Sequence, residues 1–307
     1  MTDPKTDSQS DVWSEWLLHH RHGDDCTYGA VVRDVVAGYA DRVLDAAQLS
    51  PGMTLADIGA GEGLIAFRAI DRIGPSLSVI LTDISAPMLR HSEALAVQRE
   101  VRNQCTFLEC SAEKLGEIAD SSVDVVTTRA VLAYVADKKA AVREFYRVLK
   151  PGGRISLAEP IFQDEAFYVR ALKARIDAPV PGRDDRFLRL LHRWRATQFP
   201  DTADEFAKSP IVNYSERDLI NFIRVSGFTE IHLQLHIDVT PSPVTSWEVF
   251  LHSSPHPWAP PLSVILAERF TAHERQYFET IVRPTIESGK NISTDRVAYL
   301  NAIKPLA

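Results

Sequence analysis

The sequence predicts an α/β protein built on a mostly parallel sheet. Residues 53–58 form a short apolar run, a glycine-rich turn follows it, and a helical pattern then extends over 64–73. A second apolar run at 77–82 ends in Asp83. A strand, a helix and a second strand in this order make up the crossover unit of parallel sheets. The first half of the chain is therefore expected to fold as an α/β core.

The turn after the first strand carries three glycines at alternate positions, Gly59, Gly61 and Gly63. Glycine lets the backbone turn sharply and lets a ligand approach it closely. Asp57 stands at the carboxyl end of the first strand, the edge at which open parallel sheets bind ligands. Asp83 follows Gly63 by about 20 residues, the spacing at which an acidic side chain meets ribose hydroxyls. The pattern therefore predicts a site for a nucleoside-bearing cofactor.

The next 80 or so residues continue the alternation of helices and strands. Helices are predicted at 86–99, with Ser85 as its cap, and at 137–149. Further strands are predicted at 105–110, 122–128 and 154–158, and Pro151 blocks continuation of the helix before the last of them. The alternation therefore extends the parallel sheet to five strands.

These motifs together resemble the class I S-adenosylmethionine-dependent methyltransferases, and within them the quinone-biosynthesis and small-molecule enzymes. The resemblance is close over residues 49–160. It rests on the Asp57 to Gly63 motif, Asp83, the strand Val123-Asp124-Val125-Val126, and Glu144-x-x-Arg147 followed by Pro151-Gly152-Gly153. It implies a Rossmann-like, seven-stranded, mostly parallel sheet in which the last strand, 296–303, lies antiparallel beside the fifth.

The resemblance also implies the cofactor, S-adenosyl-L-methionine, and the residues that hold it. Asp83 would bind both ribose hydroxyls, and Asp57 would help to hold the amino end of the methionine part. Ser111 stands at the adenine edge, where many relatives have an acidic residue. The implied cofactor-binding residues are Asp57, Gly59, Gly61, Gly63, Asp83, Ile84, Ser111, Ala112 and Arg129.

Helices are expected on both sides of the core, which is placed at 49–160. Residues 1–10 are predicted to be a disordered tail, and 11–48 a helical cap in which Trp13, Trp16 and Leu17 recur at helical spacing. In the resembled family such helices often lie over the cofactor and the substrate, so we expect Trp13, Trp16 and Tyr28 near this lid. The alternative is that the tryptophans only pack the helix onto the core.

Two helical insertions follow the core, at 161–210 and at 241–292 within a C-terminal part, 211–307, that completes the sheet. The helix predicted at 185–197 carries Arg186, Arg189 and Arg193 on one side. This side is interpreted as a solvated face, as a site for a substrate carboxylate, or as a nucleic-acid contact. The second insertion, with helices at 243–251 and 262–288, is expected either to cover the chain itself or to form a homodimer surface.

The strand predicted at 230–239 separates these two insertions. It alternates apolar residues from Ile231 to Val239 with polar ones. The polar set, expected to face solvent or a cover, is His232, Gln234, His236 and Asp238.

Composition limits the class of function. The chain has 307 residues and a net charge of −7, which argues against a nucleic-acid partner. Its three cysteines, Cys26, Cys105 and Cys110, have neither disulfide nor zinc spacing, so a reducing, cytoplasmic compartment and no metal are predicted. No apolar run approaches the length of a membrane span, so no membrane partner is expected.

The predicted function is methyl transfer to a small, soluble, polar acceptor, with a carboxylate-bearing amino acid or specialised metabolite favoured by the arginines. The acceptor atom is open among nitrogen, sulfur, oxygen and carbon. The alternative is a non-catalytic protein of the methyltransferase fold. Candidate substrate contacts are Trp13, Trp16, Tyr28, Tyr134, Glu159 and Arg186. No catalytic residue is assigned, since His192, His232, His236, His252 and Glu159 are all conceivable bases.

Overall fold

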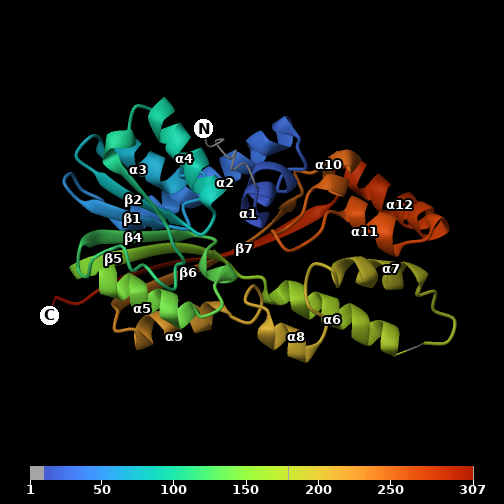
Figure 1. Ribbon diagram of the computed structural model, residues 1–307. Coiled ribbons are helices and arrows are strands. Elements are labelled where there is room, and N and C mark those ends of the chain that lie inside the picture. Colours follow the sequence, from blue (N-terminus) through green and yellow to red (C-terminus); the bar gives the residue numbers. More distant parts are fainter. Residues whose placement is uncertain (1–9, 179, 307) are drawn as a thin grey trace, which may run out of the picture.

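A computed structural model describes residues 10–178 and 180–306, so residues 1–9 of the predicted tail lie outside the described residues. It contains one seven-stranded sheet in the order β3-β2-β1-β4-β5-β7-β6 (Figure 1). Strand β7 runs antiparallel to both of its neighbours, while β1 to β5 pair in parallel. This confirms the predicted fold class. The strands are β1 (Thr54–Ile58), β2 (Ser78–Asp83), β3 (Cys105–Glu109), β4 (Val123–Arg129), β5 (Leu149–Pro160), β6 (Thr229–Pro241) and β7 (Ile292–Ile303).

Helices cover both faces of the sheet (Figure 1). Those on one face are α2 (Cys26–Ala47), α3 (Leu64–Ile73) and α4 (Ala86–Gln98), and those on the other are α5 (Lys138–Val148) and α9 (Glu216–Val225). Successive strand residues alternate between the faces, so Leu55 packs in one apolar cluster and Ala56 in the other. The predicted cap Ser85 accepts a hydrogen bond from the Met88 N–H at 3.2 Å, which fixes the start of α4 directly after β2.

The two helical insertions pack against each other beside the sheet (Figure 1). The first holds α6 (Gln163–Asp177), α7 (Arg186–Arg195) and α8 (Ala203–Lys208), and the second α10 (Trp247–His252), α11 (Leu262–Arg269) and α12 (Ala272–Glu287). Leu190 and Trp194 of α7 join the cluster of Trp247, Leu262 and Phe278. The second insertion therefore covers α7 of the same chain.

The single helix predicted at 262–288 is wrong. The chain is extended at Phe270, and Thr271 begins a new helix by a reciprocal capping box with Glu274. Pro284 lies inside α12, which continues to Glu287. The local capping signal therefore outweighs the apolar pattern that runs through both helices.

The N-terminal lid consists of α1 (Val12–Glu15) and η1, a turn of π-helix at Trp16–His20. Two contacts fasten it to distant parts of the chain. The Trp16 indole N–H donates to the Ser254 carbonyl at 3.0 Å, and the Arg21 guanidinium pairs with Glu62 of the glycine turn at 3.0 Å. The lid therefore bridges the core and the second insertion. No helix among the described residues is long and apolar enough to cross a membrane.

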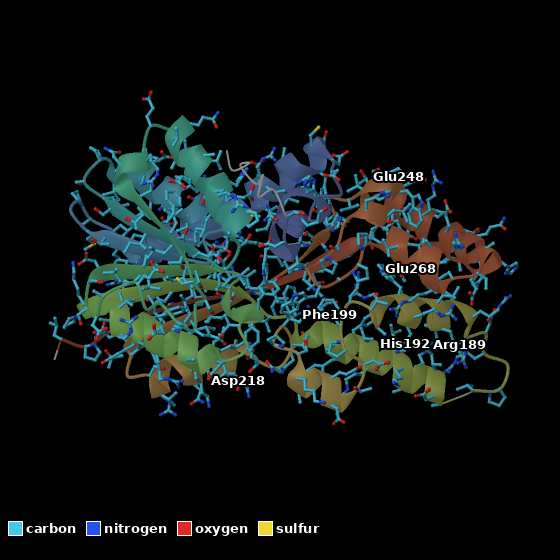
Figure 2. The ribbon with its side chains drawn as sticks, in the orientation of Figure 1. Arg189, His192, Phe199, Asp218, Glu248 and Glu268 are labelled. Atoms are coloured by element: carbon cyan, nitrogen blue, oxygen red, sulfur yellow. The ribbon has the colours of Figure 1, made fainter. Side chains whose placement is uncertain are left out.

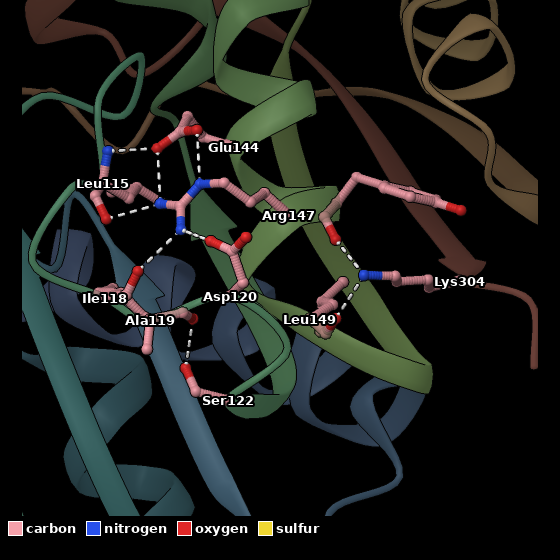
Figure 3. A network of polar contacts seen from close by, with 10 residues as sticks. Leu115, Ile118, Ala119, Asp120, Ser122, Glu144, Arg147, Leu149 and Lys304 are labelled. Carbon is pink, nitrogen blue, oxygen red and sulfur yellow. Dashed lines mark hydrogen bonds and ion pairs between the residues drawn. The ribbon is translucent and has the colours of Figure 1, made fainter. Parts of the chain in front are cut away.

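Arg147 anchors the connection between β3 and β4 (Figure 3). Its guanidinium donates to the carbonyls of Leu115 at 2.8 Å and Ile118 at 2.9 Å, and it pairs with Glu144 at 2.8 Å. Glu144 in turn accepts the Leu115 N–H at 2.7 Å. The connection begins at Cys110, so this network holds in place the segment that carries Ser111 and Ala112.

Arg147→Met is expected to lower the free energy of unfolding by about 2 kcal/mol, because it leaves two carbonyls and a partly buried carboxylate without their charged donor. Arg143→Met is the matched control on the same helix, since Arg143 is exposed and lies 3.9 Å from its only ion-pair partner in the described chain. It is expected to cost less than about 0.5 kcal/mol. Urea denaturation measures both, and equal losses would contradict the anchoring role.

Candidate functional site

A cavity of about 290 Å³ opens at the carboxyl edge of the sheet, beneath the N-terminal lid. Strands β1, β2 and β4 supply its floor, and the connection after β3 supplies one wall. Seven residues predicted to bind the cofactor line it, namely Gly59, Gly61, Asp83, Ile84, Ser111, Ala112 and Arg129. Residues far apart in the sequence therefore meet at the edge where parallel sheets bind ligands.

The glycine turn is closely packed where it passes β4. Gly59 has φ +64°, and a Cβ placed there would lie 2.5 Å from a methyl carbon of Val131. Gly61 has φ +54°, and its nearest neighbour would be Leu17 of the lid at 3.6 Å. Gly63, also at positive φ, begins α3 and does not line the cavity. The turn therefore presents bare backbone to a ligand at Gly61.

Asp83 links the turn to the end of β2. Its carboxylate accepts the Gly61 N–H at 2.8 Å and the Ser85 N–H at 2.9 Å. Burial raises the pKa of this carboxyl, and these two hydrogen bonds oppose that rise. A carboxylate has about four acceptor positions, so Asp83 keeps capacity for two hydroxyl groups in the cavity that it lines.

Asp57 lies under the turn and does not line the cavity. It is buried and accepts the Thr127 hydroxyl at 3.0 Å and the Ala66 N–H at 3.3 Å. Burial raises the pKa of this carboxyl to about 7, against the effect of both hydrogen bonds. Asp57 therefore ties the end of β1 to β4 and to α3.

Aromatic rings form the wall on the lid side. Trp13, Trp16 and Tyr134 line the cavity, and the Trp13 and Tyr134 rings meet edge to face at 5.1 Å. Trp258 of the second insertion packs against the Tyr134 ring at 5.5 Å. The sequence did not predict this contact behind the wall, because Trp258 is more than 100 residues from Tyr134 and no local pattern links them.

Arg129 supplies the positive charge of the cavity lining. Its guanidinium makes no hydrogen bond or salt bridge to any residue that the structure describes. Burial lowers its pKa, and the nearby Arg21 lowers it further, but arginine stays charged in proteins. The cavity therefore contains a cation whose hydrogen-bond donors have no partner in the described chain.

Residues 49–182 match the model of a family described as a methyltransferase domain. This match assigns residues 49–182 to a methyltransferase domain. The matched segment includes the glycine turn, Asp83 and Arg129, and it ends within the first insertion. The methyltransferase core is therefore the part of the chain that builds the cavity floor.

Curated relatives match over the same core. The nocamycin O-methyltransferase of Saccharothrix syringae is 36% identical over 127 residues, which are 40% of this chain and 43% of that protein. The ubiquinone/menaquinone biosynthesis C-methyltransferase UbiE of Xanthomonas oryzae pv. oryzae is 39% identical over 113 residues, 37% of this chain and 44% of that protein. The chain thus spans less than half the length of these relatives.

Solved structures share the fold over most of this chain. The YcgJ protein from Bacillus subtilis aligns with a TM-score of 0.52 at 20% identity, covering 87% of this chain and 98% of that one. The cyclase SpnF aligns with a TM-score of 0.51 at 19% identity, covering 89% and 82%. These likenesses extend the shared fold beyond the segment that the relatives match.

Three predicted substrate contacts lie outside the cavity. Tyr28 packs in the apolar cluster of the second insertion. Glu159 is fully buried and accepts the Thr128 hydroxyl at 2.6 Å and the Val131 N–H at 3.0 Å, so it positions the wall from behind. Arg186 has a side chain that is 71% exposed and pairs with Asp184 at 2.7 Å.

The arginine-rich helix and the conceivable histidine bases are also distant from this cavity. Figure 2 shows Arg189 and His192 on α7, away from the core sheet. His192 pairs with Asp201 at 2.8 Å, and His236 pairs with Arg42 at 2.6 Å. No histidine is among the described residues that line the cavity. The histidines named as conceivable bases from the sequence therefore do not line the cavity in the fold.

Gly59→Ala is expected to reduce the affinity of the protein for S-adenosylhomocysteine at least about 10-fold, because the added Cβ must displace Val131 or the turn. Gly52→Ala is the control, since Gly52 also has a positive φ of 85° but nothing lies within 4 Å of its added Cβ. Titration calorimetry measures both variants. A Gly59→Ala affinity equal to that of Gly52→Ala would show that the turn tolerates a side chain.

Proposed function

We propose that this protein binds S-adenosyl-L-methionine and transfers its methyl group to a small acceptor that carries a negative charge. The observation that carries the proposal is the unpaired Arg129 guanidinium, which lies in the same cavity as the glycine turn and Asp83. The turn and Asp83 would bind the cofactor, and Arg129 and the aromatic wall would bind the acceptor. The relatives are named for transfer to oxygen and to carbon, so the acceptor atom is left open.

The cavity residues fit the cofactor. Gly61 exposes backbone against which the methionine part can lie, and Asp83 has free acceptor positions for the ribose hydroxyls. Ile84 and Ala112 offer apolar surface for the adenine, with Ser111 at its edge. When bound, the cofactor supplies a methyl group that its own sulfonium charge activates. The role of the chain is then to align the acceptor with that methyl group.

Arg129 favours an anionic acceptor for two reasons. A partly buried guanidinium without a partner gains from an anion, and a carboxylate or an ionised hydroxyl matches its planar donors. A nearby cation also lowers the pKa of an acidic hydroxyl, which shifts the acceptor toward its nucleophilic form. Such an acceptor needs no histidine base, in agreement with the described lining. Trp13 and Tyr134 would hold a planar acceptor by their ring faces and edges.

A second candidate is a protein of this fold that binds the cofactor without transferring its methyl group. The lack of a histidine in the described cavity lining favours it for any acceptor that must lose a proton to a base. Binding of S-adenosylhomocysteine without methylation of any acceptor in a broad panel would support this candidate.

The test is transfer of a radiolabelled methyl group from S-adenosylmethionine to a panel of small acceptors, which pairs carboxylates and acidic phenols with neutral amines of similar shape. We expect turnover with anionic members only. Arg129→Met should lower kcat/KM for them by about 10- to 100-fold, the value of a hydrogen bond to a charged group. Its affinity for S-adenosylhomocysteine should change by less than about threefold, because the proposed partner of Arg129 is the acceptor.

Arg189→Met is the matched control, because Arg189 is an exposed arginine on the arginine-rich helix α7. It should leave kcat/KM unchanged. Turnover of neutral amines alone, or equal losses in the two variants, would contradict the role proposed for Arg129.

A further inference from the structure

Strand β6 is an exposed edge of the sheet. It lies outermost in the strand order, beyond β7, and spans 13 residues. The outer half of the strand, residues 235–241, exposes apolar side chains to solvent. The exposed fractions of Leu235, Ile237 and Val239 are 38%, 53% and 62%. The opposite edge strand, β3, has only five residues. The long edge therefore combines free backbone groups with an uncovered apolar row.

Natural proteins usually protect such an edge, since a long apolar edge strand is a template for pairing with another chain. Lysine, proline and inward-pointing charges are the common means, and there is neither lysine nor proline between Glu230 and Thr240. A bulge shifts the register only near Thr229. The outer half of β6 is therefore regular in its pairing with β7, as expected of a strand that a partner strand covers.

We propose that β6 pairs with β6 of a second copy of this chain, antiparallel and across a two-fold axis at Leu235. Each residue then faces the partner residue at the same distance on the other side of Leu235. Leu233 faces Ile237, and Ile231 faces Val239, so the apolar row meets an apolar row. On the other face His232 lies opposite Asp238, an imidazole against a carboxylate. The strand is complementary to itself in both shape and charge.

Other symmetric registers fit less well. Residues that face each other across an antiparallel pair point to the same side of the sheet. The two-fold axis must therefore lie between a residue and its own copy, and not between two successive residues of the strand. Moving the axis to Gln234 sets Glu230 against Asp238, which brings two carboxylates together. Moving it to His236 sets His232 against Thr240 and loses the imidazole–carboxylate pair. The Leu235 axis alone among the three unites apolar matching with His232 and Asp238.

Pairing at β6 would also steady the lid. The outer half of β6 forms a ribbon with β7, in which Val239 pairs with Thr294, and the second insertion connects these two strands. That insertion provides the Ser254 carbonyl to which the Trp16 indole donates, and the Trp258 ring against Tyr134. A second copy therefore fixes the support on which the aromatic wall rests.

Sedimentation velocity and native mass spectrometry over a concentration series test the proposal on the full chain. We expect a dimer for the wild type. Ile237→Lys should raise the dimer dissociation constant about 100-fold or more, because the substitution acts twice across the axis. Val97→Lys is the control, since Val97 is an equally exposed apolar residue on α4, 61% exposed. It should leave the dimer unchanged, and circular dichroism checks that both variants fold.

A charge exchange tests the register. His232→Asp should weaken the dimer by facing Asp238 of the partner subunit with a second carboxylate, and Asp238→Lys should weaken it by facing His232 with a cation. A mixture of the two variants should form the heterodimer. In it the introduced carboxylate faces the introduced ammonium at one end of the ladder, and the original His232 faces the original Asp238 at the other.

Two results would overturn the proposal, namely a monomeric wild type or a dimer that is insensitive to Ile237→Lys. Failure of the mixed variants to associate would overturn the Leu235 register.

Discussion

The hydrogen bond from the Gly61 N–H to the Asp83 carboxylate joins the two elements on which the site depends. It ties the turn after β1 to the end of β2, which are neighbours in the sheet but 22 residues apart in the chain. The positive φ values of the turn make this approach possible, and Asp57 ties the end of β1 to α3. The polar residues of the cavity floor thus lie together because β1, β2 and β4 end at the same edge of the sheet.

The lid-side wall of the cavity joins tryptophans of the lid to Tyr134 of the core. Trp258 of the second insertion packs behind this wall, on the rings of Trp13 and Tyr134. The ion pair between Arg21 and Glu62 fastens the lid to the glycine turn itself. The proposed cofactor and acceptor sites are therefore linked through the lid, because movement of the lid would disturb both.

The core could be predicted from sequence because its signals are local. The glycine turn, the acidic residues at the ends of β1 and β2 and the cap at Ser85 each act within a few residues, and the structure has them where the pattern places them. The acceptor side was only partly predictable. Trp13 and Tyr134 line the cavity, but Tyr28, Glu159 and Arg186 do not, because their places depend on how the insertions pack.

Titration calorimetry with S-adenosylhomocysteine tests the central claim that the cavity is a cofactor site organised by Asp83. The account predicts micromolar binding by the wild type and its loss in Asp83→Ala. Asp71→Ala, which removes an exposed acid on α3, should leave the affinity unchanged. No binding by the wild type, or equal binding by the wild type and Asp83→Ala, would contradict the assignment of the cavity to the cofactor.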